Sequence, residues 1–199
     1  MSLYPRKSNF TGELIQRVFT LVPGVFGYFI TPTLIELGSP DAAATDSILD
    51  STVLGAGSTQ TTFKGQPIYP RSLSITGVGG GATGDVVITG TNMLDEEIIE
   101  EIALSGTATV QGNKAFKTVT SIVLPPDSGA TGEECSVGFG NKLGIPFLLP
   151  ANTVFSAYLA GVRETTMPTV ATDGSYIEGN TVLLDSALNG EQVTIILGV

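Results

Sequence analysis

The stretch from Arg71 to Pro146 constrains the fold most, because short runs of alternating apolar and polar residues are separated there by glycine-rich turns. Leu73 and Ile75 alternate with serine and threonine, and a glycine-rich break at residues 77–84 precedes the next run, Asp85–Thr89. Such alternation is typical of half-buried strands, and glycine-rich breaks of this kind are typical of hairpin turns. No catalytic residue type accumulates in this stretch. The pattern therefore predicts a β-rich module whose role is to pack against other protein.

From Phe63 to the C-terminus, strand signals recur about every 10 to 14 residues. This spacing predicts an all-β fold over residues 63–199, an antiparallel β-sandwich or small barrel of the jelly-roll-like or Ig-like kind. Residues 1–62 are expected to form an extended N-terminal arm and a connector. A short apolar pattern from Ile48 to Leu54 has the spacing of about two helical turns. The expected strands are residues 66–70, 72–77, 85–91, 97–105, 107–111, 114–124, 134–139, 143–149, 153–160, 175–178, 181–185 and 191–197.

The run Asp95–Leu104 is compatible with a helix or a strand. Its three isoleucines have helical spacing, but a helix would also align its four glutamates in two like-charge pairs. We therefore predict a strand in which Ile98, Glu100, Ile102 and Leu104 share a face, with Glu100 at the solvent end.

The segment 114–124 does not follow one alternating pattern. Phe116 and Ile122 fall on one face of a regular strand, whereas Val119 falls on the other. A β-bulge inserts one extra residue and reverses the alternation beyond it, so a bulge near Thr118 is expected.

The charge of the chain narrows its range of partners. The formal net charge is −10, with nine basic residues in 199, which argues against nucleic acid because a phosphate-binding surface needs clustered lysine and arginine. Only 14% of the residues are charged, against about 25% in an average soluble domain. Low charge reduces the desolvation cost of burying a surface against another subunit. The composition therefore favours a component of an assembly.

The most apolar segment, Val18–Ile30, does not suit a membrane. It has 13 residues and is interrupted by Pro23, Gly24 and Gly27, whereas a spanning helix needs about 20 apolar residues. We expect it to belong to the mature protein. The single cysteine, Cys135, excludes an internal disulfide, so we expect a buried, inert thiol and folding in a reducing cytoplasm.

The residue types that support catalysis are scarce. The chain has no histidine, which excludes a Ser-His-Asp triad and a histidine metal site. The glycine-rich segment 77–84 lacks the Gly-Lys-Ser/Thr ending of a phosphate-binding loop and is expected to be a flexible turn. The carboxylates at 95–101 lack the partners of a glycosidase pair or an EF-hand loop, and a solvated acidic edge explains them. We therefore expect no enzymatic activity, no metal and no cofactor.

The first of two candidate contact regions is the N-terminal segment. Its first 35 residues carry six of the 14 Phe and Tyr residues and three of the nine basic residues. Ordering a backbone costs about 1–2 kcal/mol per residue, whereas burying an aromatic side chain returns about 1.5–3 kcal/mol. The segment cannot order itself alone, so it either adds strands to the main domain or docks on a neighbouring subunit. Its basic residues either meet an acidic neighbour or lie in solvent.

The second candidate region is the run Gly138–Pro146, which contains three glycines. We expect a tight loop, and its functional interpretation is a contact loop that presents Lys142 to an acidic partner. The candidate subunit-interface residues in the two regions are Arg6, Lys7, Phe10, Arg17, Phe19, Phe26, Tyr28, Phe29, Phe139 and Lys142.

Five motifs, in their order along the chain, resemble small structural proteins of tailed bacteriophages and prophages that are encoded in the head-gene region. The similarity covers roughly residues 68–150 and continues more weakly through residues 180–199. The most specific motif contains the run Gly-Asn-Lys-Ala-Phe-Lys. The motifs are Pro70–Thr76, Gly84–Asn92, Glu101–Gly106, Gly112–Ile122 and Gly138–Pro146.

The resemblance implies a structural virion protein of the capsid decoration, or cement, type. Such a protein would be made in the host cytoplasm and would sit on the capsid exterior, where it binds the major capsid protein and copies of itself, as a homotrimer. Its N-terminal arm would clasp a neighbouring subunit. Two alternatives remain open: a head-to-tail connector or tail-tube component, and an adhesin or fibre module that binds carbohydrate.

Overall fold

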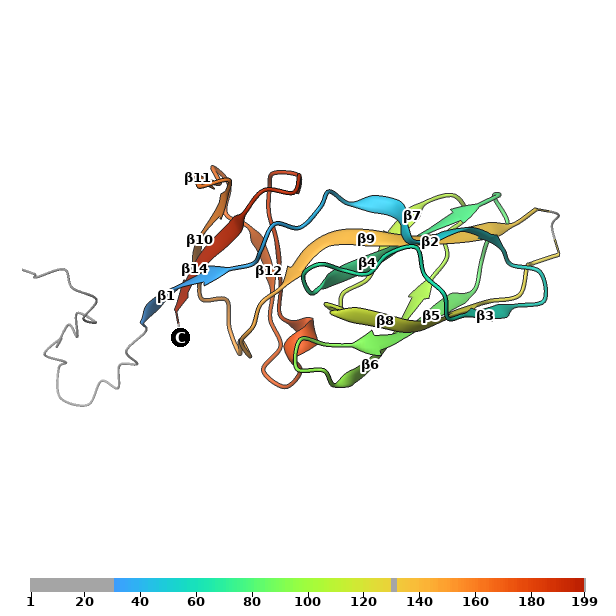
Figure 1. Cartoon of the computed structure of the whole chain (residues 1–199), viewed down its shortest axis with the longest axis horizontal. Coiled ribbons are helices and arrows are strands. Elements are labelled where there is room, and N and C mark those ends of the chain that lie inside the picture. The colour runs from blue at the N-terminus through green and yellow to red at the C-terminus, as the bar shows by residue number, and fades with distance from the viewer. Residues whose placement is uncertain (1–30, 130–131, 199) are drawn as a thin grey trace, which may run out of the picture. The chain divides into compact units, whose positions relative to one another are not determined.

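A computed structural model describes residues 31–129 and 132–198, which form an all-β structure of three antiparallel sheets that includes a curled half-barrel (Figure 1). The predicted all-β antiparallel class is therefore confirmed. The predicted N-terminal arm lies outside the described residues as far as residue 30. Within the described ranges, no helix is long and apolar enough to span a bilayer.

Sheet A has the strand order β1-β14-β10-β11 and joins the two ends of the described chain. β1 pairs with β14 over five residue pairs, from Pro32 opposite Gly198 to Glu36 opposite Thr194. On β14 every second side chain is buried up to Leu197, as the alternation in the sequence predicted. The strands are β1 (Pro32–Glu36), β14 (Val193–Gly198), β10 (Val154–Leu159) and β11 (Val162–Arg163).

Sheet B has the order β12-β13-β9-β4-β7, and β2 also pairs with β9. β9 is the longest strand of the described chain, and it pairs with β2, β4 and β13. The strands are β2 (Ala44–Val53), β4 (Arg71–Val78), β7 (Thr109–Gln111), β9 (Glu134–Gly144), β12 (Thr169–Ala171) and β13 (Thr181–Leu183). A 3-10 turn, η1 (Ile177–Gly179), precedes β13 where a strand was expected.

Sheet C has the order β3-β8-β5-β6. Along β6, exposed and buried residues alternate without interruption, so the strand that we predicted in this run is confirmed and the helical alternative is wrong. The strands are β3 (Ser58–Gln60), β5 (Asp85–Thr91), β6 (Glu97–Ala103) and β8 (Thr118–Leu124).

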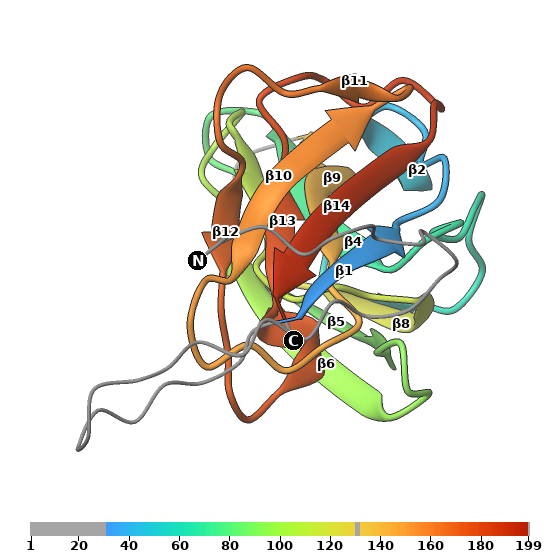
Figure 2. The same cartoon turned by 90° about the vertical axis from the view of Figure 1, so that its left-hand side faces the viewer.

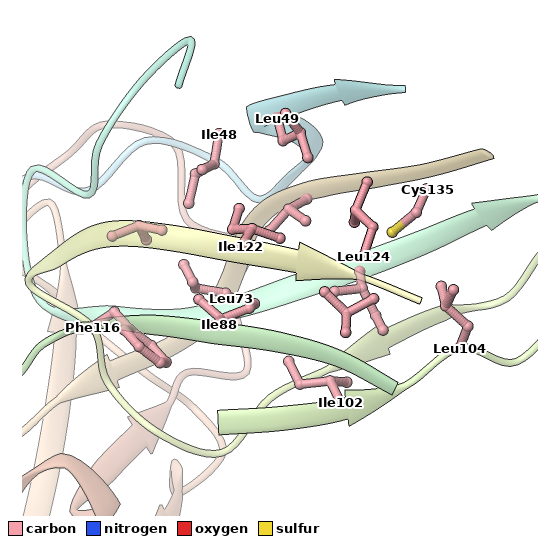
Figure 3. Close-up of a cluster of buried hydrophobic side chains, with 14 of the residues drawn as sticks. Ile48, Leu49, Leu73, Ile88, Ile102, Leu104, Phe116, Ile122, Leu124 and Cys135 are labelled. Carbon is pink, nitrogen blue, oxygen red and sulfur yellow. The ribbon is translucent and has the colours of Figure 1, made fainter. Parts of the chain in front are cut away.

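Two hydrophobic cores hold the sheets together. In the first, side chains from sheets B and C point toward one another, among them Leu73, Ile88 and Ile122, and Phe116 from the segment before β8 packs with them (Figure 3). The second core lies under sheet A and takes in Leu143 of β9 and residues of β13 and β14. Because β9 contributes to both cores, it ties sheet A to the rest of the domain. The predicted buried thiol, Cys135, lies in the first core, and burial raises its pKa to about 12.

Residues 31–62, expected as part of an arm and a connector, contribute three strands to the sheets. The helical turns expected after residue 45 are wrong, since β2 occupies this segment. Ala44 lies opposite Phe139 and Leu49 opposite Val137, so the pairing of β2 with β9 shifts register between them. This shift breaks the two-residue period of a strand and buries the adjacent Ile48 and Leu49, which gives the sequence its helix-like spacing.

The bulge predicted in segment 114–124 lies in β8, two residues beyond Thr118. Thr89 of β5 faces Ser121, whereas Gly90 faces Val119, so Thr120 is left without an opposite residue. The extra residue lets Val119 and Ile122 reach the same core. The register shift therefore explains the irregular alternation.

The tight loop expected at residues 138–146 is wrong, because β9 continues as a strand through Gly144. Its glycines serve close approach instead of a turn. A Cβ on Gly138 would overlap the carbonyl oxygen of Ala44, and a Cβ on Gly140 would lie 2.9 Å from the carbonyl oxygen of Ser72. Glycine is required here because neighbouring backbones occupy the space of a side chain.

Candidate functional site

The structure describes two of the ten predicted interface residues. Phe139 and Lys142 both lie on β9, and the other eight fall outside the described residues: Arg6, Lys7, Phe10, Arg17, Phe19, Phe26, Tyr28 and Phe29. The Phe139 side chain is 8% exposed and belongs to the first core. Lys142 is half-buried, and its Nζ donates hydrogen bonds to the carbonyl oxygen of Gly112 at 3.0 Å and to Oδ1 of Asn113 at 2.7 Å. Both side chains are therefore used inside the domain.

Arg71 is a buried charged residue that sequence reasoning missed. Its side chain is 1% exposed. Its Nε donates to the carbonyl oxygen of Gly140 at 2.9 Å, Nη2 donates to the same oxygen, and Nη1 donates to the carbonyl oxygen of Asp41 at 2.8 Å. The guanidinium carbon lies 5.0 Å from the centre of the Phe139 ring. Burial lowers the pKa of Arg71 to about 10, so the group stays charged at neutral pH. Its hydrogen bonds connect β4 with β9 and with the segment around Asp41.

Glu100 was expected at the solvent end of its strand, and this expectation is wrong. The residue is 8% exposed. Its Oε1 accepts hydrogen bonds from the backbone N–H of Asn113 at 2.5 Å and of Lys114 at 3.2 Å, while Oε2 has no hydrogen-bond partner among the described residues. A Cβ on Gly112 would lie 2.5 Å from Oε2. Burial raises the pKa of Glu100. The two N–H donors and the charges of Lys114 and Lys142 act in the opposite direction, and burial is the larger effect.

The buried Glu100 carboxyl predicts a pH-dependent stability. Because its folded-state pKa lies above its ordinary value of 4.5, its contribution is fully present below that value and is lost as pH rises through the folded-state pKa. Glu100→Gln keeps the shape without the charge. We expect the free energy of unfolding of Glu100→Gln, measured by urea titration, to increase relative to that of the unmodified chain as the pH rises from 4 to 8.

Glu101→Gln is the matched control for this experiment, since Glu101 is the next residue of β6 and faces solvent. Its stability should run parallel to that of the unmodified chain over the same pH range. If Glu100→Gln also runs parallel, the buried carboxylate carries no electrostatic cost and the interpretation is wrong.

A cavity of about 480 Å³ lies between the start of β6 and η1. Nδ2 of Asn92 donates to Oε2 of Glu96 at 2.9 Å and to Oε2 of Glu178 at 3.3 Å, and Nζ of Lys114 lies 3.9 Å from Oε1 of Glu178. Four of the polar side chains that line the cavity are therefore bonded to one another. In the described part of the chain, no group of three or more His, Cys, Asp or Glu residues could hold a metal ion. The lining residues are Asn92, Glu96, Glu97, Ile98, Ile99, Lys114, Tyr176 and Glu178.

β1 is one of the strands at the edges of the described sheets, at the end of sheet A (Figure 2). Among the described residues, β1 pairs with β14 alone. The N–H of Leu37 donates to the carbonyl oxygen of Val193 at 2.9 Å, and in an antiparallel pair alternate residues face the partner strand. Thr33 and Ile35 therefore bond toward β14, whereas the N–H and C=O of Leu34 point outward. The Leu34 side chain is 60% exposed.

Comparisons of the chain with protein-family models, curated proteins and solved structures gave no match.

Proposed function

We propose that this chain is a structural protein of a bacteriophage virion that decorates and stabilises the capsid by binding major capsid subunits. The observation that carries the proposal is the edge of β1, which no strand of the described residues covers and which exposes Leu34. An unpaired edge of this kind readily pairs with another chain unless it is covered. The virion context comes from the resemblance of residues 68–150 to phage structural proteins.

The polar groups of the domain support a scaffold role. Oδ1 of Asn180 accepts hydrogen bonds from the N–H of Leu149 at 3.0 Å and of Asp173 at 2.8 Å, and its Nδ2 donates to the carbonyl oxygens of Asp173 and Tyr176. Asn180 is fully buried. Like Arg71, it bonds strands and loops of its own chain to one another. Side chains used in this way rigidify a fold, which suits a protein that stiffens a shell.

The charge distribution supports attachment through the N-terminal segment. Residues 1–30 contain three of the nine basic residues and one of the 19 acidic residues, so residues 31–199 contain the other six and 18. The net charge is therefore +2 for residues 1–30 and −12 for residues 31–199. A basic, aromatic segment of one subunit is thus complementary to an acidic neighbour, and complementary charge speeds association and selects partners. A stable contact buries about 800 Å² on each partner.

The test is binding to capsids that lack this protein. Purified chain is added to such heads, and the bound fraction is measured by sedimentation together with the temperature at which the heads rupture. We expect saturable binding at many sites over the shell and a higher rupture temperature. Absence of binding contradicts the proposal, and binding confined to one vertex favours the head-to-tail connector instead. A glycan array that gives clear binding would favour the carbohydrate-binding alternative.

A further inference from the structure

We propose that the folded chain cross-links itself through an isopeptide bond between Nζ of Lys142 and Cγ of Asn113, with the carboxyl group of Glu100 as the proton acceptor. The reaction uses only groups of this chain. It does not depend on the virion role proposed above.

The amine of Lys142 and the amide of Asn113 are already in contact. Nζ of Lys142 donates a hydrogen bond to Oδ1 of Asn113 at 2.7 Å, and the carbon to be attacked, Cγ, is bonded to this oxygen. A second hydrogen bond, from Nζ to the carbonyl oxygen of Gly112 at 3.0 Å, holds the amine in place. Lys142 lies on β9 and Asn113 follows β7, so sheet B positions both groups. Groups held together in this way react far faster than the same groups free in solution.

A buried carboxyl group lies at the same two residues of the chain. Oε1 of Glu100 accepts a hydrogen bond from the backbone N–H of Asn113, and Oε2 has no hydrogen-bond partner among the described residues. Oε2 lies against Gly112, where a Cβ would come within 2.5 Å of it. The charge of Lys142 acts on this carboxyl group, whose pKa is raised by burial. A carboxyl group with a raised pKa accepts and returns protons more readily at neutral pH.

The reaction balances without an added reagent. Lys142 gives one proton to the Glu100 carboxylate and becomes a neutral amine, which attacks Cγ of Asn113. The Nζ–Cγ bond forms and the Cγ–Nδ2 bond breaks, while a second proton passes from Nζ to Nδ2, so that Nδ2 leaves as ammonia. The proton on Glu100 then passes to the ammonia, which departs as ammonium. Asn113 is exposed, so the ammonium can diffuse into solvent.

Lys117 provides a comparison within the same chain. Its Nζ donates to Oδ1 of Asp95 at the same distance of 2.7 Å, but the two side chains are 41% and 69% exposed. Such a pair is an ordinary solvated salt bridge. The buried carboxyl group of Glu100 therefore distinguishes the pair of Lys142 and Asn113.

The cross-link would join the two neighbours of β4. Lys142 belongs to β9 and Asn113 follows β7, and β4 lies between these strands in sheet B. The two residues are 29 positions apart in the chain. A covalent bond between them restricts the unfolded chain as a disulfide does, so its loss should lower the melting temperature by about 10 °C.

Intact mass and tryptic mapping of the purified chain, after overnight incubation at neutral pH, test the proposal. We expect the chain to be lighter than its sequence mass by one ammonia molecule. Trypsin does not cut after a lysine whose Nζ is acylated, so residues 72–114 should be recovered joined to residues 118–163. A chain of full sequence mass overturns the proposal. Loss of ammonia with the peptides separate, as a succinimide at Asn113 would give, overturns it as well.

Matched variants test the role of each group. Lys142→Arg keeps a charged donor that is not a nucleophile, and Glu100→Gln keeps the shape of the proton acceptor without its basicity. We expect both to have the full mass and separate peptides, and the controls Lys117→Arg and Glu101→Gln to keep the joined peptides. Circular dichroism should show folded protein throughout, with Lys142→Arg melting about 10 °C below Lys117→Arg. An undiminished rate of cross-linking in Glu100→Gln would overturn the role given to Glu100.

Discussion

Replacing Arg71 with alanine will lower the free energy of unfolding by about 3–5 kcal/mol. The carbonyl oxygens of Gly140 and Asp41 lose their donor, and each buried polar group left without a partner costs about 1–3 kcal/mol. The contact of the guanidinium with the Phe139 ring and the packing of the buried aliphatic stem are lost as well. Urea unfolding followed by circular dichroism measures the change.

Arg71→Met is the control that separates packing from hydrogen bonding, because methionine fills much of the same space but donates no hydrogen bond. We expect it to be destabilised by about half as much as the alanine variant. Since Nη1 of Arg71 holds the carbonyl oxygen of Asp41, both variants should also be cut faster by protease between β1 and β2. A methionine variant as stable as the unmodified chain would show that the hydrogen bonds contribute nothing.

Replacing Gly138 with alanine will destabilise the domain by about 3 kcal/mol or more. The new Cβ would overlap the carbonyl oxygen of Ala44 and lie 2.6 Å from the carbonyl carbons of Ala44 and Thr45. These atoms belong to the backbone of β2, which cannot rotate away as a side chain can. With a total stability of about 5–15 kcal/mol for a typical domain, we expect a large loss of soluble protein and a lower melting temperature.

Gly80→Ala is the matched control for this substitution. A Cβ on Gly80 would have no atom within 4 Å and its φ lies outside the left-handed region, so its melting temperature should stay within a degree or two of that of the unmodified chain. Equal stability of the two alanine variants would contradict the close approach of β2 and β9.

The pair β5 and β6 of sheet C could be predicted from the sequence, whereas the pairing of β2 with β9 could not, and both outcomes have physical reasons. In β5 and β6 each strand keeps its two-residue period and the neighbours are consecutive in the chain. In contrast, the register shifts of β2 hide its period, and the glycines of β9 look like turn residues although they admit neighbouring backbones. A glycine that serves close approach cannot be told from a turn glycine before the pairing of strands is known.

The roles of the buried polar residues were hidden for a similar reason. Arg71 bonds to Gly140, 69 residues later in the chain, and Glu100 bonds to the N–H groups of Asn113 and Lys114. A charged residue at an inward position of an alternating strand is a signal for such a contact. Its partner depends on which strands become neighbours, and local patterns do not carry that information.

An electron cryo-microscopy map of intact virions that contain this chain, with the domain of residues 31–198 located in it, decides most directly whether the protein decorates a capsid. We expect the domain on the outer surface of the shell, in contact with major capsid subunits at positions repeated over the lattice. A single ring of the domain at the portal vertex, a place in the tail tube, or its absence from the particle would contradict the proposed function.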